Sequence, residues 1–165
     1  MGGAVAVDDG KLEAWKLTAG GTAEQGGVLL ATNHSSLDVR DSSFSGFSSG
    51  TTPASPPFTA DNGGCILALD ADEVRVWGSR FEHCATNGNG AGMAVIDDLA
   101  PSYPTLLDLV DTEFVENSAQ GDGGGLYTYG VEESSIEDCV FDSNHSVGDG
   151  GGAMLGRFEG RPLRC

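Results

Sequence analysis

The sequence is short of positive charge and of long apolar segments. Eight Lys and Arg residues stand against 25 Asp and Glu residues in a chain of 165, which gives a net charge of −17. Such a chain repels nucleic acids and anionic membranes, so neither is expected as a partner. No stretch is long and apolar enough to cross a bilayer, so we expect no direct membrane insertion by this segment.

Helical periodicity and the cysteine spacing of metal sites are lacking too. The chain holds 26 glycines, and its apolar residues do not recur every 3.6 positions, which disfavours a helical fold. The four cysteines show no C-x-x-C spacing of the kind that zinc or redox motifs use. We interpret them as small interior residues, with one disulfide if the protein is secreted.

What the sequence does contain is a repeat. "FVENSAQGDGGGLY", which begins at Phe114, recurs 27 residues later as "FDSNHSVGDGGGAM". In both copies an Asn follows the Phe by three residues and a glycine triplet follows it by nine. The offset of nine also links Phe81 to Gly90 and Leu17 to Gly26. A fixed period of this length indicates an architecture of stacked repeats.

Each repeat is expected to be made of β-strands. Five positions before each Phe, and before Leu17, the residue is aliphatic, and the residue before that is polar in every copy. This period of two predicts half-buried strands. The aliphatic positions are Leu12, Val39, Val76, Leu109 and Ile136. Strands joined by glycine turns on a 27-residue period predict an all-β fold, a parallel β-helix of about five rungs.

The interior of this β-helix follows from the same offsets. Equivalent residues of successive rungs lie over one another, so the Phe positions predict a buried aromatic stack with Leu17 at its end. Asn117 and Asn144 are expected at a buried bend, where their amides would bond to the backbone and to each other. The predicted stack consists of Leu17, Phe44, Phe81, Phe114 and Phe141.

We expect one domain over residues 1–165. The two irregular intervals coincide with Pro-rich sequence, which predicts protruding loops at 46–62 and 96–105. No polar cap is visible at either end, so the chain is expected to be a fragment of a longer β-helix that is uncapped at both ends.

The motifs carry a family resemblance. "GGAV" at 2–5 and "GGAM" at 151–154, together with "FVEN" and "FDSN", resemble the repeats of polymorphic outer-membrane proteins. That family is marked by a GGA-aliphatic and an F-x-x-N tetrapeptide. The resemblance implies a right-handed β-helix of the pectin-lyase-like class, displayed outside the cell or at its surface as an adhesin or autotransporter passenger.

Three groups of side chains are candidates for chemistry. The first is an outward column of alternating charge, Lys11, Asp38, Arg75 and Asp108, which we interpret as structural. The second is an enzyme-like patch in which a base and two carboxylates would share one face. Its weak catalytic candidates are Arg80, His83, Glu113 and Glu116.

The third group is acidic. Asp111 would lie over Asp138, and Asp122 over Asp149 in matching "GDGG" turns. Oxygen ligands from stacked turns can hold Ca²⁺, so these four are weak calcium candidates, and no other cofactor is expected.

The sequence therefore favours an extracellular or cell-surface segment for adhesion or structural display, without catalysis of its own. Its partner would be a host-surface, matrix or polysaccharide ligand. The alternative is a fragment of a carbohydrate-active lyase or hydrolase of the pectin-lyase-like class.

Overall fold

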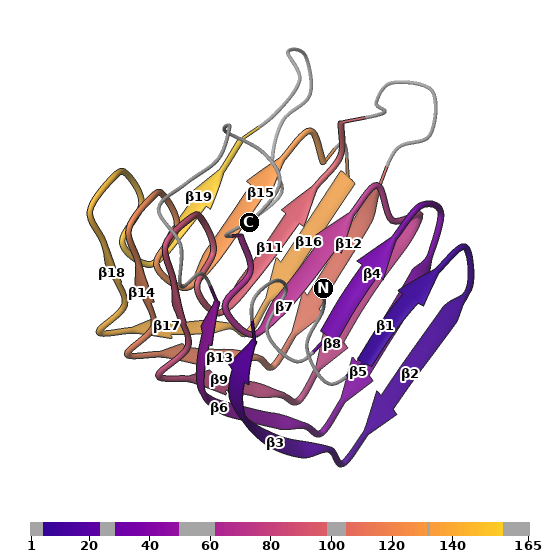
Figure 1. Ribbon diagram of the computed structural model, residues 1–165, viewed down its shortest axis with the longest axis horizontal. Helices are drawn as coiled ribbons and strands as arrows, with labels where there is room; N and C mark the ends of the chain where they lie inside the picture. Colours follow the sequence, from indigo (N-terminus) through magenta and orange to yellow (C-terminus); the bar gives the residue numbers. More distant parts are fainter. Residues whose placement is uncertain (1–4, 24–28, 50–61, 99–104, 132, 157–165) are drawn as a thin grey trace.

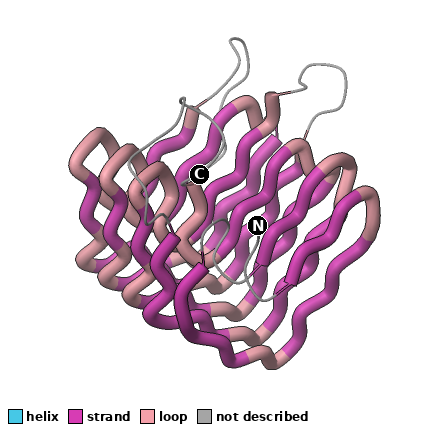
Figure 2. The backbone as a smooth tube through the Cα atoms, viewed as in Figure 1, coloured by secondary structure: helices cyan, strands magenta, loops and turns pink. Residues whose placement is uncertain are grey.

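A computed structural model describes residues 5–23, 29–49, 62–98, 105–131 and 133–156. Within these ranges the chain forms strands and turns and no helix. The path runs through three sheets in turn and then repeats one strand further along, from β1 at the indigo end to β19 at the yellow end (Figure 1). Figure 2 shows the same path as strands separated by short turns.

All three sheets are parallel, and each contains one strand or strand pair from every rung. Sheet A consists of β1 (Val5–Asp8), β4 (Leu29–Thr32), β7 (Ile66–Leu69), β11 (Met93–Ile96), β15 (Leu126–Tyr129) and β19 (Ala153–Leu155). Sheet B consists of β2 (Lys11–Trp15), β5 (Ser36–Arg40), β8 (Glu73–Trp77), β12 (Leu106–Val110) and β16 (Glu133–Glu137).

Sheet C has a bend in its later rungs, where two short strands replace one long strand. It consists of β3 (Thr18–Ala23), β6 (Ser43–Ser49), β9 (Arg80–Glu82), β10 (Ala85–Thr86), β13 (Glu113–Val115), β14 (Ser118–Ala119), β17 (Val140–Asp142) and β18 (His145–Ser146). The chain is therefore a parallel β-helix of five rungs followed by a further strand, β19, which confirms the fold expected from the repeat.

A column of phenylalanine rings fills the centre of the β-helix. Phe44, Phe81, Phe114 and Phe141 stack with ring centroids 5.0, 5.0 and 4.9 Å apart and interplanar angles of 5°, 14° and 2°. The first three rings are fully buried, and the last, on the terminal rung, is partly buried. Burial of each ring contributes about 1.5 to 3 kcal/mol to folding.

The predicted register of the first rung is wrong by two residues. Ala19, and not Leu17, lies beside Phe44, while Leu12 lies beside Leu37 and not Val39. The cause is a shorter connection. Ten positions separate Ala19 from the start of β4, whereas twelve separate Phe81, Phe114 and Phe141 from the sheet A strand that follows each. Leu17 packs at the edge of the core instead.

Glycine is required at the turn that leads into sheet A. Gly90 has φ of +66°, and a Cβ there would lie 2.3 Å from the Met93 carbonyl oxygen, so a side chain is excluded by strain and by space. Two positions later, at Gly92, the aromatic stack leaves no room for a side chain. A Cβ on Gly92 would lie 2.7 Å from the Phe114 ring, which explains the constant spacing between Phe and glycine triplet.

The two predicted loops fall largely outside the described residues. Residues 50–61 and 99–104 are not described, and nothing follows for them. The described flanks are regular: Gly46 to Ser49 continue β6, Ile96 ends β11, and Thr105 is buried. None of the described residues belongs to a helix that could span a membrane.

Sheet A is apolar on both faces. Its inward side chains join the main core, and a second cluster forms on the outward face from Leu67, Ala94, Ile96 and Tyr127, all of which are buried. Sheet B differs, because its outward side chains are mostly polar or charged. The outer surfaces of the two sheets therefore have different chemistry.

Candidate functional sites

The residues of the predicted enzyme-like patch form an ion pair and a His–Glu contact on the outer side of sheet C. Arg80 on β9 lies directly beside Glu113 on β13 and forms an ion pair with it. Its Nη2 also lies 3.0 Å from Glu82 Oε1 on its own strand. The hydrogen bond to Glu82 is the largest cause of a raised pKa at Arg80, and the same bond lowers the pKa of Glu82.

The His–Glu contact lies at the next turn. His83 and Glu116 occupy equivalent positions with φ of +54° and +51°, and His83 Nε2 lies 2.8 Å from Glu116 Oε2. Sequence spacing therefore placed Arg80 with Glu113 and His83 with Glu116 correctly.

The arrangement favours surface pairing over chemistry. The side chains of Glu113 and Glu116 are about half exposed, and each carboxylate faces a basic group on the neighbouring rung. Glycoside hydrolysis uses an acid and a second carboxylate that both act on one glycosidic bond. Here each carboxylate is paired with a basic group instead.

The acidic turns form a ladder of side chains that bond to the backbone. Asp122 Oδ1 accepts a hydrogen bond of 2.8 Å from the backbone N–H of Asp149. Asn89 Oδ1 accepts one of 2.7 Å from Asp122, and Asn62 Oδ1 one of 2.8 Å from Asn89. Asn62, Asn89, Asp122 and Asp149 each directly precede a glycine turn. Because the Asp122 carboxylate accepts from the Asp149 N–H on the following rung, it joins two rungs.

Asp111 and Asp138 lie at another turn, between sheets B and C. Both have positive φ and exposed side chains, and the Asp111 N–H donates to the Glu137 carbonyl. In the described part of the chain, no group of three or more His, Cys, Asp or Glu side chains is arranged to hold a metal ion. Asp111, Asp138, Asp122 and Asp149 therefore serve as turn residues here, and calcium binding at them remains a prediction.

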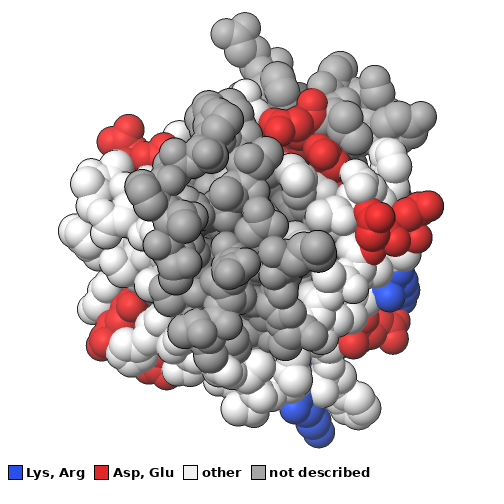
Figure 3. All heavy atoms as spheres, in the orientation of Figure 1, with Lys and Arg blue, Asp and Glu red and all other residues white. Residues whose placement is uncertain are grey.

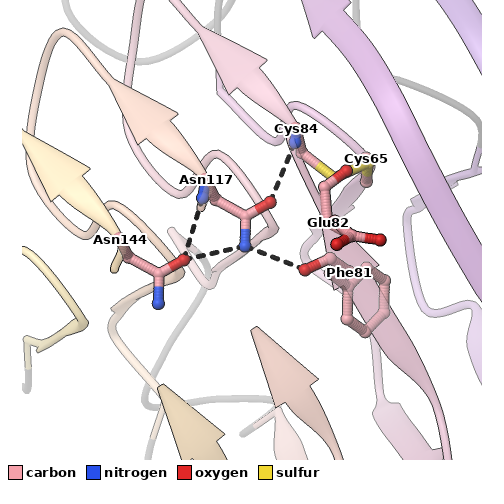
Figure 4. Close-up of a disulfide and its surroundings, with 6 residues drawn as sticks. All are labelled: Cys65, Phe81, Glu82, Cys84, Asn117 and Asn144. Carbon is pink, nitrogen blue, oxygen red and sulfur yellow. Dashed lines mark hydrogen bonds between the residues drawn. A yellow bond between two sulfur atoms is a disulfide. The ribbon is translucent and has the colours of Figure 1, made fainter. Parts of the chain in front are cut away.

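Asn117 and Asn144 form an amide ladder inside the bend of sheet C (Figure 4). Asn117 Oδ1 accepts from the Cys84 N–H at 2.9 Å, and Asn117 Nδ2 donates to the Phe81 carbonyl at 3.0 Å. Asn144 Oδ1 accepts from both the backbone and the side-chain nitrogen of Asn117, at 3.0 and 2.9 Å. Asn144 Nδ2 donates to the Phe114 carbonyl.

In the third rung a disulfide cysteine occupies the position that Asn117 and Asn144 occupy in the next two rungs. Cys84 precedes Ala85, which pairs with Ser118, so it stands where Asn117 stands one rung later. It is bonded to Cys65, and both residues are fully buried (Figure 4). Cys139 is free, and burial raises the pKa of its thiol.

The predicted column of alternating charge is altered by the register of the first rung. Glu13, and not Lys11, lies beside Asp38, and the column continues through Arg75 and Asp108. The first two residues of the column, Glu13 and Asp38, are therefore both acidic. Opposite charges pair along each strand instead of across strands. Arg40 binds Asp38 through two hydrogen bonds of 2.7 Å, and this contact is the largest cause of a lowered pKa at Asp38.

Comparison of the chain with family models, curated proteins and solved structures finds no match. Its function therefore has to be inferred from its own residues.

Three features of the structure were not predicted from the sequence. The Asn62 and Asn89 ladder had a signal, because an Asn or Asp directly precedes each glycine turn from the third rung on. The pairing of Cys65 with Cys84 had none, since four cysteines allow several pairings. The third feature, the surroundings of Trp15 and Trp77, was hidden by the register of the first rung.

Proposed function

We propose that this chain is a secreted or cell-surface β-helical segment that serves adhesion or structural display and carries no catalysis of its own. One observation supports this most: the side chains that a catalytic or metal site would need are used to hold rungs together. Asp122 bonds to the next rung, and Glu113 and Glu116 pair with basic groups on their neighbouring rung.

The disulfide supports the location. Cys65–Cys84 is fully buried in the core, and such bonds form and persist in oxidising compartments such as the cell exterior. A net charge of −17 suits a soluble, exposed surface as well. Both observations agree with the resemblance to polymorphic outer-membrane protein repeats, whose right-handed pectin-lyase-like form and surface display we propose for this chain.

The test measures retention and turnover together. The protein is incubated with a panel of insoluble polysaccharides and surfaces coated with matrix proteins, and bound protein and newly released reducing sugar are both quantified. We expect retention on at least one surface without sugar release. An unrelated globular protein of similar net charge controls for non-specific electrostatic effects.

The alternative, a fragment of a carbohydrate-active enzyme, is favoured by one arrangement. Arg80, His83, Glu113 and Glu116 do meet on one surface, as a base and two carboxylates would. Sugar release that disappears in Glu113→Gln or Glu116→Gln, with the thermal stability unchanged, would establish the enzyme and refute the display function. Absence of retention on every surface would refute adhesion.

A further inference from the structure

Both tryptophans of the chain lie in one outward column of sheet B. Trp15 at the end of β2, Arg40 at the end of β5 and Trp77 at the end of β8 are paired in register. The sequence holds only these two Trp residues. Their exposed fractions are 70% and 38%, although Trp is on average highly buried in proteins. Two exposed tryptophans on either side of Arg40 make this column a candidate ligand face.

Each indole ring is held by a hydrogen bond to the next rung and by a cation over the ring. Trp15 Nε1 donates to Asp41 Oδ2 and Trp77 Nε1 donates to Asp108 Oδ2, both at 3.2 Å and both to the next rung. Lys16 Nζ lies 5.0 Å from the Trp15 ring centre, and Arg40 Cζ lies 4.9 Å from that of Trp77. Rings fixed before binding lose little entropy when a ligand packs on them.

The charge around the rings is arranged in local pairs. Lys11 pairs with Glu13 at 2.5 Å and Arg75 with Glu73 at 2.5 Å, each along its own strand. Arg40 pairs with Asp38 in the same way. Arg157, Arg161 and Arg164 lie outside the described residues. Of the other Lys and Arg side chains, all but Arg80 lie on or beside sheet B.

This distribution argues against charged partners. Figure 3 shows one face of the protein, where acidic side chains gather at several separate places and basic ones at few. With a net charge of −17, a polyanion is repelled by the whole molecule. A basic polypeptide would be drawn to the surfaces that lack Lys and Arg, and not to the face where most of the described cations lie. A neutral partner fits the face best.

The distance between the two tryptophans indicates which neutral polymer would fit this face. Trp15 and Trp77 are separated by two strand spacings, about 9 to 10 Å. In an extended polysaccharide of equatorially linked pyranoses, alternate sugars lie a comparable distance apart and present the same face of C–H groups. Between the two rings, the Arg40 side chain is 48% exposed and its guanidinium is held by two hydrogen bonds to Asp38. Its remaining N–H groups can donate to the hydroxyls of the middle sugar.

We infer that the outer face of sheet B around Trp15, Arg40 and Trp77 binds an extended, neutral, equatorially linked polysaccharide whose chain runs along the axis of the β-helix. This inference rests on the proposed adhesive function and names the ligand class for it. Three successive sugars would contact the exposed parts of Trp15, of Arg40 and of Trp77, whose rings Lys16 and Arg40 cover on one side.

Because both tryptophans lie in the site, their fluorescence reports binding directly. The protein is titrated with soluble β-1,4-linked gluco-oligosaccharides from two to six sugars long. We expect a shift of the emission to shorter wavelength and a step of at least about tenfold in affinity between two and three sugars, the shortest length that spans both rings.

Trp15→Ala and Trp77→Ala should each weaken binding of the hexasaccharide at least about tenfold, measured by calorimetry. Val147→Ala is the matched control, because Val147 is 64% exposed and lies on the other side of the sheet C bend. It should leave the affinity unchanged. Both Trp variants should keep the melting temperature within a few degrees, since they alter exposed side chains.

Three results would overturn the inference. No response of either Trp to any oligosaccharide would do so, as would hexasaccharide binding that both Trp variants retain. A response to polylysine but not to the sugars would identify a site for basic polypeptides instead. If the protein still adheres to surfaces in any of these cases, the proposed function stands and only the sheet B ligand is wrong.

Discussion

The corner beside the phenylalanine stack is held differently in neighbouring rungs. In the third rung a disulfide joins Cys84 to Cys65, two residues of the same rung. In the fourth and fifth rungs Asn117 and Asn144 bond to the preceding and following rungs instead. A covalent bond here closes a single turn of the coil, whereas the amide ladder ties turns to one another. The disulfide corner and the amide corner are in direct contact, because the Cys84 N–H donates to Asn117 Oδ1.

The difference shows which part of the repeat is constant. Phe81, Phe114 and Phe141 continue past both kinds of corner with almost constant ring spacing. The stack is therefore common to the second to fifth rungs, whereas the corner varies. Variants of the stack and of each corner separate these contributions.

The largest effect is expected from the stack that both corners share. Phe114→Ala removes a fully buried ring between Phe81 and Phe141 and should lower the free energy of unfolding by about 3 to 5 kcal/mol. Urea unfolding followed by far-ultraviolet circular dichroism measures it. Phe114→Leu is the control for size and should cost clearly less. A loss below about 1 kcal/mol would contradict a continuous core.

Loss of the disulfide comes next. Cys65→Ala with Cys84→Ala opens a loop defined by a sequence separation of 19 and should cost about 3 kcal/mol. Wild type unfolded under reducing conditions should show a similar loss.

A second double variant sharpens the comparison. Cys65→Gly with Cys84→Asn gives the third rung the Gly and Asn found at the equivalent positions Gly92 and Asn117. If the two corners are interchangeable, this variant should regain part of the stability that the alanine pair loses. Equal stability of the two double variants would contradict the interchange of the two corners, because Asn117 is already present beside position 84.

The amide ladder should contribute less than the disulfide. Asn117→Ala leaves the Cys84 N–H and the Phe81 carbonyl without their side-chain partner in the core, at a cost of about 1 to 3 kcal/mol. Asn144→Ala should cost less, because its corner on the last described full rung is only partly buried. The order of the two unfolding midpoints in urea is the measurement, and the reverse order would contradict the ladder.

These contacts show which parts of the structure could be predicted from the sequence. The Phe and glycine positions were predictable because a stack and a tight turn each restrict one position in every rung. Asn117 and Asn144 were predictable for the same reason. The replacement of Asn by Cys84 was visible as an exception, but its partner was not, since a disulfide depends on distances in three dimensions.

The first rung was misplaced because Ala19 carries no aromatic signal, so Leu17 was taken as its equivalent. A slip of two residues keeps the alternation of inward and outward side chains, and hence left no internal contradiction. It moved Trp15 out of the column of Arg40 and Trp77. The candidate ligand face of sheet B thus became visible only with the strand pairing.

The smallest expected effect comes from acid, which affects neither corner directly, because a disulfide and an amide do not titrate. Asp38 on sheet B does titrate, and its two hydrogen bonds from Arg40 hold its pKa below the ordinary carboxyl value. A lowered pKa in the folded state means stability that is present above the unfolded pKa and is lost as pH falls through the folded one.

Arg40→Gln should therefore flatten the decline of the melting temperature below the ordinary carboxyl pKa. Asn117→Ala should lower the melting temperature at every pH without changing the slope of the curve. Melting curves from neutral pH down to the acid limit, with all three proteins at one ionic strength, measure both slopes. A changed slope in the Asn117 variant would mean that the amide ladder and the acidic surface are coupled, and the corner could then no longer be treated as independent of charge.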